Sequence, residues 1–343
     1  MNRYTYQEVD DEKDVDLSAI CAGTPYTQAT FYGKWQEKLG GAAKSYSVYD
    51  GDKVVAYFQA IKYPLARGKC YMYVPYGPVV KEYSDDLIAS IKSKLKEIAR
   101  NQNAAFVRLD FTPTAPSNIL GKYFKKSPPY TYHGAILQPR TEWFLELGKS
   151  EDELIADVQR KTRWAIRASE RQGVTSEIVT MDFSNYFDDF YRLMSETSKR
   201  NGFGLHSKKY YAAIFDDLDK VQNSYLSVAR YEDKVLIINV ILVYDGVAMY
   251  MFSGSSSEER DRNPSYLALW KAVCHAKQLD CKYYNFGGVS TDSDAHKSWD
   301  GLTSFKKKFG GHEVAHSDFY DLVIDPIWYR IYTARRRIKQ LHR

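Results

Sequence analysis

The chain has 343 residues, of which 44% are hydrophobic and 27% are charged, and its net charge is +5. At roughly 100–200 residues per domain this length predicts two domains or one large one, and the composition excludes a disordered or fibrous protein. Positions 326–343 contain five arginines, one lysine and no acidic residue, so subtracting these six charges leaves −1 elsewhere, and the basic end favours a polyanion or an anionic surface as partner.

Two segments about 180 positions apart predict the same succession of elements. Residues 46–61 and 226–241 each combine a strand, an acidic turn and a second strand rich in β-branched and aromatic residues. A second turn and a third strand follow in both copies, beginning at Cys70 in the first and at Val247 in the second.

Each copy continues with a helix and a further strand, at 85–100 and 105–111 in the first and at 265–277 and 282–287 in the second. The helix at 85–100 places four apolar side chains on one face: Leu87, Ile91, Leu95 and Ile98. Because five successive elements agree in order, we interpret the two segments as an internal duplication.

More helices are predicted at 151–172, 183–200 and 208–218, ahead of the second copy. The first of them is charged and amphipathic, with four apolar anchors: Leu154, Ile155, Val158 and Trp164. Helices, an antiparallel meander, a helix and a crossover strand indicate α+β domains with mixed sheets. This layout resembles two acetyltransferase-like (GNAT-like) domains, each with a mixed sheet flanked by helices.

Several classes of protein lack support in the sequence. The N-terminal MNRYTYQEVDDEKDVD is too acidic for a signal peptide, and the longest apolar run, 235–244, is too short to span a bilayer. The cysteines show no paired spacing that would indicate disulfides or structural zinc: Cys21, Cys70, Cys274 and Cys281. We expect a cytoplasmic protein without a metal site.

Known cofactor motifs are also missing. The pyrophosphate loop of acetyl-CoA-dependent acetyltransferases, Arg/Gln-x-x-Gly-x-Gly/Ala, has no match in the chain, and neither a Walker nor a Rossmann glycine pattern is present. The seven histidines are scattered without metal-ligand spacing. We therefore expect no cofactor.

Three local patterns have the residue types that binding or catalysis uses. The segments 285–289 (NFGGV) and 305–311 (FKKKFGG) place lysines beside flexible backbone, which indicates either an anion or oxyanion site or a solvated basic turn. Arg200 precedes Gly202 at the end of a predicted helix, where it either binds an anion or complements the helix dipole. Asp110 ends a strand, where it either orients an amine or terminates the strand.

In this order, the segments resemble the Fem (FemABX) family of aminoacyl-tRNA-dependent peptidyltransferases, which build peptidoglycan cross-bridges. The matching stretches run along most of the chain: 76–80 (YGPVV), 107–110 (VRLD), 161–174 (KTRWAIRASERQGV), 197–203 (TSKRNGF), 250–257 (YMFSGSSS), 263–270 (NPSYLALW), 284–289 (YNFGGV), 301–311 and 319–326 (FYDLVIDP). No heptad repeat is visible, which indicates the compact type without a coiled-coil arm. The resemblance implies two GNAT-like domains, residues 1–145 with 318–343 and residues 146–317.

The resemblance also implies a reaction. The amine of the third stem-peptide residue in lipid II or UDP-MurNAc-pentapeptide attacks the ester carbonyl of a Gly-, Ala- or Ser-tRNA, and the protein positions both substrates and stabilises the oxyanion. Lys306, which follows Phe305, matches the family lysine at that carbonyl and the tRNA end. Asp110 matches a carboxylate near the attacking amine, where a general-base role is reasonable. Tyr250 matches a tyrosine that lines the cleft.

The precursor's diphosphate has expected contacts of its own. Arg200, in the segment that begins at Thr197, matches a residue that grips the diphosphate through its forked guanidinium. A second diphosphate lysine of the family aligns with Gln36 here, so either Lys34 or Lys38 is expected to replace it.

Two other functions stay open from sequence. One is an acyl-CoA-dependent N-acyltransferase on the same fold, and the other is a non-enzymatic RNA- or membrane-binding protein. Residues 327–343 predict an amphipathic helix with one face on the first domain and a basic face for tRNA phosphate or for anionic lipid at the inner face of the cell membrane. Its apolar residues are Trp328, Tyr329, Ile331, Ile338 and Leu341. We expect a monomer.

Overall fold

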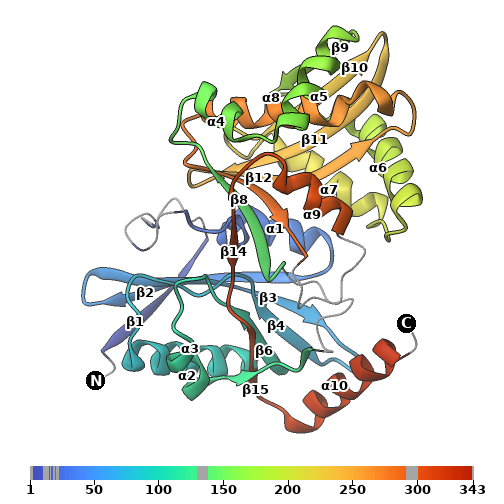
Figure 1. Cartoon of the computed structure of the whole chain (residues 1–343). Helices are drawn as coiled ribbons and strands as arrows, with labels where there is room; N and C mark the ends of the chain where they lie inside the picture. Colours follow the sequence, from blue (N-terminus) through green and yellow to red (C-terminus); the bar gives the residue numbers. More distant parts are fainter. Residues whose placement is uncertain are drawn as a thin grey trace. The chain divides into compact units, whose positions relative to one another are not determined.

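The computed structural model describes residues 3–10, 15, 17, 20, 23–129, 138–290 and 300–341, so Cys21 and Arg343 lie outside the described residues. The chain divides into two compact units, Met1–Arg140 with Ala315–Arg343 (unit 1) and Thr141–Val314 (unit 2) (Figure 1). The boundaries expected from sequence, near 145 and 317, fall a few residues later, and the first of them would cut a strand.

Unit 1 is built on a mixed sheet with the strand order β1-β2-β3-β4-β6-β15-β7, in which β5 also pairs with β3. Its strands are β1 (Tyr4–Val9), β2 (Ala42–Asp50), β3 (Lys53–Pro64), β4 (Cys70–Val74), β5 (Val79–Val80), β6 (Ala104–Asp110), β7 (Lys125–Lys126) and β15 (Phe319–Val323). Its helices are η3 (Tyr26–Gln28), α1 (Thr30–Lys38), α2 (Asp85–Asn101), α3 (Ser117–Tyr123) and α10 (Pro326–Leu341). The pair β4–β6 is parallel, as the crossover through α2 requires.

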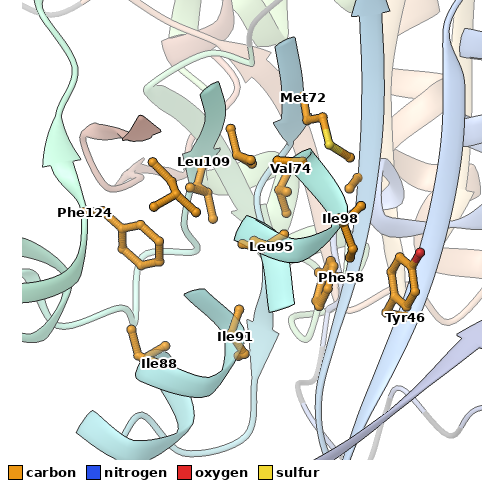
Figure 2. Packing of buried hydrophobic residues seen from close by; sticks show 14 of the residues in the cluster. Tyr46, Phe58, Met72, Val74, Ile88, Ile91, Leu95, Ile98, Leu109 and Phe124 are labelled. Atoms are coloured by element: carbon orange, nitrogen blue, oxygen red, sulfur yellow. The ribbon is translucent and has the colours of Figure 1, made fainter. Parts of the chain in front are cut away.

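The core of unit 1 forms where α2 packs on the sheet. Ser84 caps the helix by accepting a hydrogen bond from the Leu87 amide, and the predicted apolar face is fully used, with Ile91 and Leu95 completely buried. Figure 2 shows this face against sheet residues that include Phe58. At about 1.5–3 kcal/mol for each large apolar side chain, this contact is a main source of the unit's stability.

Unit 2 has a second mixed sheet, with the order β14-β8-β13-β12-β11-β10-β9. Its strands are β8 (Thr141–Glu146), β9 (Val174–Val179), β10 (Tyr225–Tyr231), β11 (Lys234–Tyr244), β12 (Val247–Ser255), β13 (Tyr283–Gly288) and β14 (His312–Ala315). Its helices are α4 (Glu151–Asp157), α5 (Arg160–Arg171), η5 (Phe183–Tyr186), α6 (Phe187–Asn201), α7 (Lys208–Leu218), η6 (Arg260–Arg262), α8 (Pro264–Gln278) and α9 (Asp300–Lys307). The pair β12–β13 is parallel.

The two sheets correspond position by position. The meander β2-β3-β4 with α2 and β6 in unit 1 has the same order as β10-β11-β12 with α8 and β13 in unit 2. The strand beside the parallel pair differs in origin, because β15 comes from the end of the chain and β8 from before the second meander. The predicted α+β architecture with two mixed sheets is thus confirmed.

The prediction of one continuous helix at 151–172 is wrong, because the structure has two helices there, α4 and α5. Val158 is extended, with φ −66° and ψ 137°, and separates α4 from α5. The Gln159 amide donates instead to the carbonyl of Lys308, at 2.9 Å. The break changes which side of α5 faces the core, so Ile166 is buried while Trp164, expected to be an anchor, is 61% exposed.

The predicted C-terminal helix is present as α10, but only some of the apolar residues expected to pack on the first domain face inward. Tyr329 and Tyr332 are buried against Phe106, whereas Ile331 and Ile338 are 43% and 55% exposed. The two tyrosines lie three residues apart and fill the inward face, so the isoleucines point outward. Among the described residues, no helix is long and apolar enough to cross a membrane.

Candidate functional site

In both units the central parallel strands stop pairing beside polar side chains. The β4–β6 register ends at Val74 and Leu109, directly before Asp110. The β12–β13 register ends at Met249 and Asn285, directly before Tyr250 on the first strand. Where paired strands separate, backbone groups and side chains are released from the ladder and become available to a ligand.

In unit 2 this position holds Lys306, from the last turn of α9. The side chain is buried, with 4% of its surface exposed, and its Nζ donates a 2.6 Å hydrogen bond to the carbonyl of Gly288. Burial lowers the pKa of Lys306 to about 8, and the nearby carboxylate of Glu142 opposes part of that shift. The ammonium is thus still the main form at neutral pH, with a proton that is easily released.

Glycine is required next to this amine. Gly287 has φ 78°, and a Cβ there would lie 3.5 Å from the Tyr250 carbonyl oxygen and 3.7 Å from Lys306 Nζ. Its amide donates to Asn285 Oδ1 at 2.7 Å, which fixes the bend. A Cβ would fit at these distances, so it is the left-handed φ of Gly287 that requires glycine at this bend beside the lysine.

Phe305 lies in an aromatic cluster. Its ring centroid is 5.1 Å from that of Tyr266 and 5.5 Å from that of Phe309. These contacts anchor α9 and so hold the following residue, Lys306, in place. The structure gives Phe305 a packing environment and Lys306 a polar one.

Arg200 lies at the end of α6 and is held by the end of β12. Its Nη1 donates to the Ser255 carbonyl at 3.2 Å and to Ser257 Oγ at 3.0 Å. Thr197 supports the same strand end, because its Oγ1 accepts a 2.8 Å hydrogen bond from the Ser255 amide. Partial burial, with the charge of Arg260 nearby, lowers the pKa of Arg200. A fixed guanidinium with a cationic neighbour is suited to an anion.

Tyr250 lies on β12 between these two cations in sequence. Its Oη donates a long, 3.5 Å hydrogen bond to Asn239 Oδ1, which also accepts from Ser253 Oγ at 2.8 Å. From Tyr250 to Ser255 the strand spans about 17 Å, at 3.4 Å per residue. One strand thus connects the lysine end of unit 2 with its arginine end.

In unit 1 the equivalent position holds Asp110, which is 1% exposed. Its Oδ2 accepts from Tyr73 Oη at 2.7 Å and its Oδ1 accepts from the Tyr76 amide at 2.6 Å. Burial raises the pKa of Asp110 to about 7, against the opposing effect of these hydrogen bonds and of His316. Each carboxylate oxygen has a second lone pair, so the group can still accept a proton.

The aromatic residues around Asp110 come from separate parts of unit 1. Tyr76 has φ 49° and stacks on His316, with ring centroids 4.0 Å apart. Gln138 joins Tyr73 to α1, since its amide donates to Tyr73 Oη and its Nε2 donates to Tyr32 Oη. α1 is thereby tied to the surroundings of Asp110.

On α1 itself the two candidate diphosphate residues have different environments. Gln36 is 4% exposed, and its Oε1 accepts a 2.9 Å hydrogen bond from Tyr63 Oη. Lys34 and Lys38 are exposed. The amide of Gln36 thus contributes to the interior, while the neighbouring lysines are accessible to an anion.

Comparison with known proteins places the chain in a family. The model of the FemAB family matches residues 129–235 and 226–337, which together make up more than half of the chain. The chain belongs to the FemAB family.

The curated relatives of this FemAB protein include transferases. It is 20% identical over 339 residues to the lipid II:glycine glycyltransferase of Staphylococcus epidermidis, covering 78% of this chain and 80% of the relative. The enzyme of the same name from Staphylococcus aureus is 20% identical over 332 residues, covering 76% and 78%.

Solved structures agree with the fold. The crystal structure of FemX superposes with a TM-score of 0.82 at 18% identity, over 95% of this chain and 99% of FemX. A tandem GNAT protein from the clavulanic acid biosynthesis pathway gives 0.58 at 11% identity, over 94% and 99%. The GNAT-like character of the FemAB protein's fold is thus shown.

The predicted site residues fall into two groups. Unit 2 contains Lys306, Phe305, Arg200, Thr197 and Tyr250, and unit 1 contains Asp110, Gln36 and Lys34. Sequence reasoning missed Tyr73 and His316, which have no local motif, and Tyr76 and Gly287, which lie inside the YGPVV and NFGGV segments. Within the described ranges, no group of three or more His, Cys, Asp or Glu side chains is placed to hold a metal ion.

Proposed function

We propose that this FemAB protein is an aminoacyl-tRNA-dependent aminoacyltransferase that adds Gly, Ala or Ser to the stem-peptide amine of a peptidoglycan precursor. The observation that carries the proposal is the buried ammonium of Lys306 at the end of the β12–β13 pairing. The names of the staphylococcal relatives favour glycine as the donor residue and lipid II over UDP-MurNAc-pentapeptide as the acceptor.

In the proposed step the acceptor amine attacks the ester carbonyl of the aminoacyl-tRNA. A C–N bond forms, the C–O bond to the ribose breaks, the amine loses a proton and the released ribose oxygen gains one. Lys306 stabilises the tetrahedral oxyanion with its ammonium, in a buried place where such a donor has a strong effect. The chemistry needs no cofactor because the ester is already activated.

Asp110 and Arg200 have supporting roles in this proposal. With a pKa of about 7, Asp110 is partly ionised at neutral pH and suited to take the proton of the amine. Arg200, with Lys34 or Lys38 in place of a lysine at Gln36, binds the diphosphate of the precursor, and Tyr250 lines the path between the diphosphate and the reacting centre. We further propose that the protein acts as a monomer at the cytoplasmic face of the membrane.

A label-transfer assay tests the proposal. The purified chain is incubated with labelled Gly-, Ala- or Ser-tRNA and either lipid II or UDP-MurNAc-pentapeptide, with acetyl-CoA as a competing donor class. We expect label in the precursor with at least one aminoacyl-tRNA and none from acetyl-CoA. The absence of transfer from all three would refute the function, and acetyl transfer instead would support the acyl-CoA alternative.

Lys306→Ala and Lys307→Ala form a matched pair for the assay. Lys306 is buried at the strand ends, whereas Lys307 is partly exposed and lies 4.9 Å from the Trp143 ring. We expect the first change to lower kcat by a factor of about 10²–10³, as for the loss of one oxyanion donor. The second is expected to change it less than twofold. Full turnover by Lys306→Ala would exclude the oxyanion role.

A further inference from the structure

α10 presents a line of apolar side chains to solvent. Ile327, Ile331, Ala334 and Ile338 follow at intervals of four, three and four residues, which aligns them along one side of a helix. The three isoleucines are 70%, 43% and 55% exposed. Eight large hydrophobic side chains of the described residues are exposed, and three of the eight lie in this isoleucine stripe. A cluster of that kind indicates an interaction surface.

The opposite side of α10 is already filled by aromatic packing. The Tyr329 and Tyr332 ring centroids lie 5.4 and 4.8 Å from that of Phe106, and Tyr329 Oη donates to Asp321 Oδ2 at 2.8 Å. These contacts fix the rotation of the helix about its axis. The isoleucine stripe therefore stays outward in the folded unit.

Arginines border the isoleucine stripe on both sides. At 100° per residue, Arg330 and Arg337 lie along one side and Arg335 along the other. All three are exposed, and within the described residues none of them forms an ion pair. α10 contains no Asp or Glu. The helix thus shows an apolar line between two cationic margins.

Beside the stripe, unit 1 has a shallow hollow between α10 and the residues that follow β3. Its lining is mainly apolar and includes Leu65, Trp328 and Tyr332, together with Arg335 and Arg336. Ile331 belongs both to this hollow and to the stripe. The apolar surface therefore continues from the stripe into this hollow, which two arginines also line.

We infer that α10 lies in the interface of an anionic lipid bilayer, with the isoleucine stripe at the acyl-chain boundary and the arginines at lipid phosphates. An amphipathic helix with basic margins binds such surfaces through apolar burial and electrostatic attraction together. A nucleic acid would use the arginines but leave the isoleucines in water, because phosphate binding gains nothing from aliphatic side chains. Charge and exposed apolar surface together thus favour a bilayer over tRNA.

The outward face of α10 thus has a proposed partner, the anionic bilayer, that is separate from the substrates of the transfer reaction. Binding to the bilayer needs no catalysis, whereas its use in bringing the enzyme to a lipid-linked acceptor rests on the proposed function. Transfer to a soluble acceptor is therefore expected to be independent of α10's outward face.

Vesicle flotation of the full chain tests the inference. The probes are vesicles of phosphatidylcholine with 30% phosphatidylglycerol and vesicles of phosphatidylcholine alone. The wild type is expected to float with the anionic vesicles and to bind at least tenfold more weakly to the neutral ones. The triple change Ile327→Ser, Ile331→Ser, Ile338→Ser is expected to lower binding at least tenfold, and Arg330→Gln, Arg335→Gln, Arg337→Gln by roughly fivefold per charge.

Matched controls distinguish specific binding through α10 from non-specific binding through any exposed apolar side chain or any positive charge. Met181→Ser removes a 66% exposed side chain of unit 2, and Lys53→Gln, Lys81→Gln, Lys96→Gln removes three exposed charges of unit 1. Both are expected to bind as the wild type does. Thermal melting by circular dichroism checks that the α10 variants remain folded, which is expected because the changed side chains are exposed.

Distinct outcomes overturn the inference. It is wrong if the isoleucine variant floats like the wild type, or if the lysine control loses as much binding as the arginine variant. It is also wrong if the arginine variant loses tRNA in a filter-binding assay while its vesicle binding is unchanged. A wild type that floats but transfers no label would support the role of α10 and refute the proposed function. A wild type that transfers label but never floats would support the proposed function and refute the role of α10.

Discussion

The buried ammonium of Lys306 lowers the stability of unit 2 at neutral pH, as an uncharged side chain in its place would not. The pKa of Lys306 is about 8 in the fold against 10.5 in an exposed lysine, so folding favours its neutral form. The unfolded chain binds more protons between these values, and the free energy of unfolding therefore rises as pH increases from about 8 to 10.5. At pH 7 the protein is therefore about 3 kcal/mol less stable than it would be with a neutral amine at this position.

We therefore predict that Lys306→Met increases stability at pH 7 while lowering kcat for transfer as strongly as Lys306→Ala does. Methionine fills a similar volume without a charge, and a gain of about 1–3 kcal/mol is expected after the loss of the bond to the Gly288 carbonyl. Urea denaturation at pH 7 and pH 10 measures the effect, and the gain should shrink at the higher pH. A variant that is less stable than the wild type at both pH values would show that the lysine is a structural residue.

For Asp110 we predict that the contribution to stability has the opposite pH dependence. Its pKa is raised from 3.8 to about 7, so its contribution to stability is present in full below pH 3.8 and is lost as the pH rises through 7. Asp110→Asn keeps the size of the side chain but does not titrate. Between pH 5 and pH 8 we expect the wild type to lose about 3 kcal/mol relative to this variant, as measured by chemical denaturation.

The same substitution tests the proposed general-base role of Asp110. Transfer by the wild type should increase with pH up to about 7, because the carboxylate is the active form, and the variant should lack this limb and show a kcat about 10²-fold lower. Tyr76→Phe is the control, since it keeps the backbone amide that donates to Asp110. An unchanged pH profile in Asp110→Asn would remove the proton-transfer role.

At the scale of elements, β15 is attached to β6 by a buried ion pair. Arg108 Nε and Nη2 donate to the two Asp321 oxygens at 2.8 and 2.9 Å, and both side chains are almost completely buried. A forked pair of this kind fixes which strand can lie next to β6 and in what register. The C-terminal segment is thereby bound to the first meander rather than to the second.

Asp321→Ala is predicted to destabilise the protein by about 3–5 kcal/mol, because it leaves the Arg108 guanidinium buried without its counterion. The exposed pair Lys44–Glu8, which joins β1 and β2, provides the control, and Glu8→Ala should cost less than about 1 kcal/mol. Urea unfolding measures both. Equal effects would mean that the buried pair is worth no more than a surface contact.

The elements that sequence predicted well are those with local signals. The turns between strands have residues with positive φ at matching places, Arg67 and Gly68 in one copy and Asp245 and Gly246 in the other. Because such turns have a local sequence signal, the duplication can be predicted from the sequence. The face of α2 followed from apolar spacing alone. By contrast, the break at Val158 depends on a hydrogen bond to a residue about 150 positions away, which no local pattern contains.

The candidate site shows the same division. Lys306, Arg200 and Asp110 can be proposed from sequence because they belong to recognisable segments. Tyr73 and His316 were missed because each reaches the neighbourhood of Asp110 only through the order of strands in the sheet. For α10, sequence spacing alone does not say that Tyr329 and Tyr332 fill the inward side while Ile331 and Ile338 remain exposed, because that choice depends on packing against Phe106.

For the whole molecule, the chain order makes the two units unequal. Unit 2 is one continuous segment with its own core, whereas unit 1 is completed by a segment that follows unit 2 in the sequence. Its last strand, β15, contributes Phe319, Tyr320 and Leu322, all buried, which amounts to roughly 5–9 kcal/mol of apolar burial besides the ion pair. Typical domain stabilities are 5–15 kcal/mol, so unit 1 should not survive the loss of β15.

We predict that a chain ending at Asp318 retains a folded unit 2 and an unfolded unit 1. Hydrogen exchange measured by mass spectrometry should show protected amides in β10, β11 and β12 and rapid exchange in β4 and β6. A chain ending at Asp325 keeps β15 and lacks only α10, so protection in β4 and β6 should largely return. Uniform loss of protection in both units of the shorter chain would mean that they fold as a single cooperative body, and uniform retention would mean that β15 contributes little.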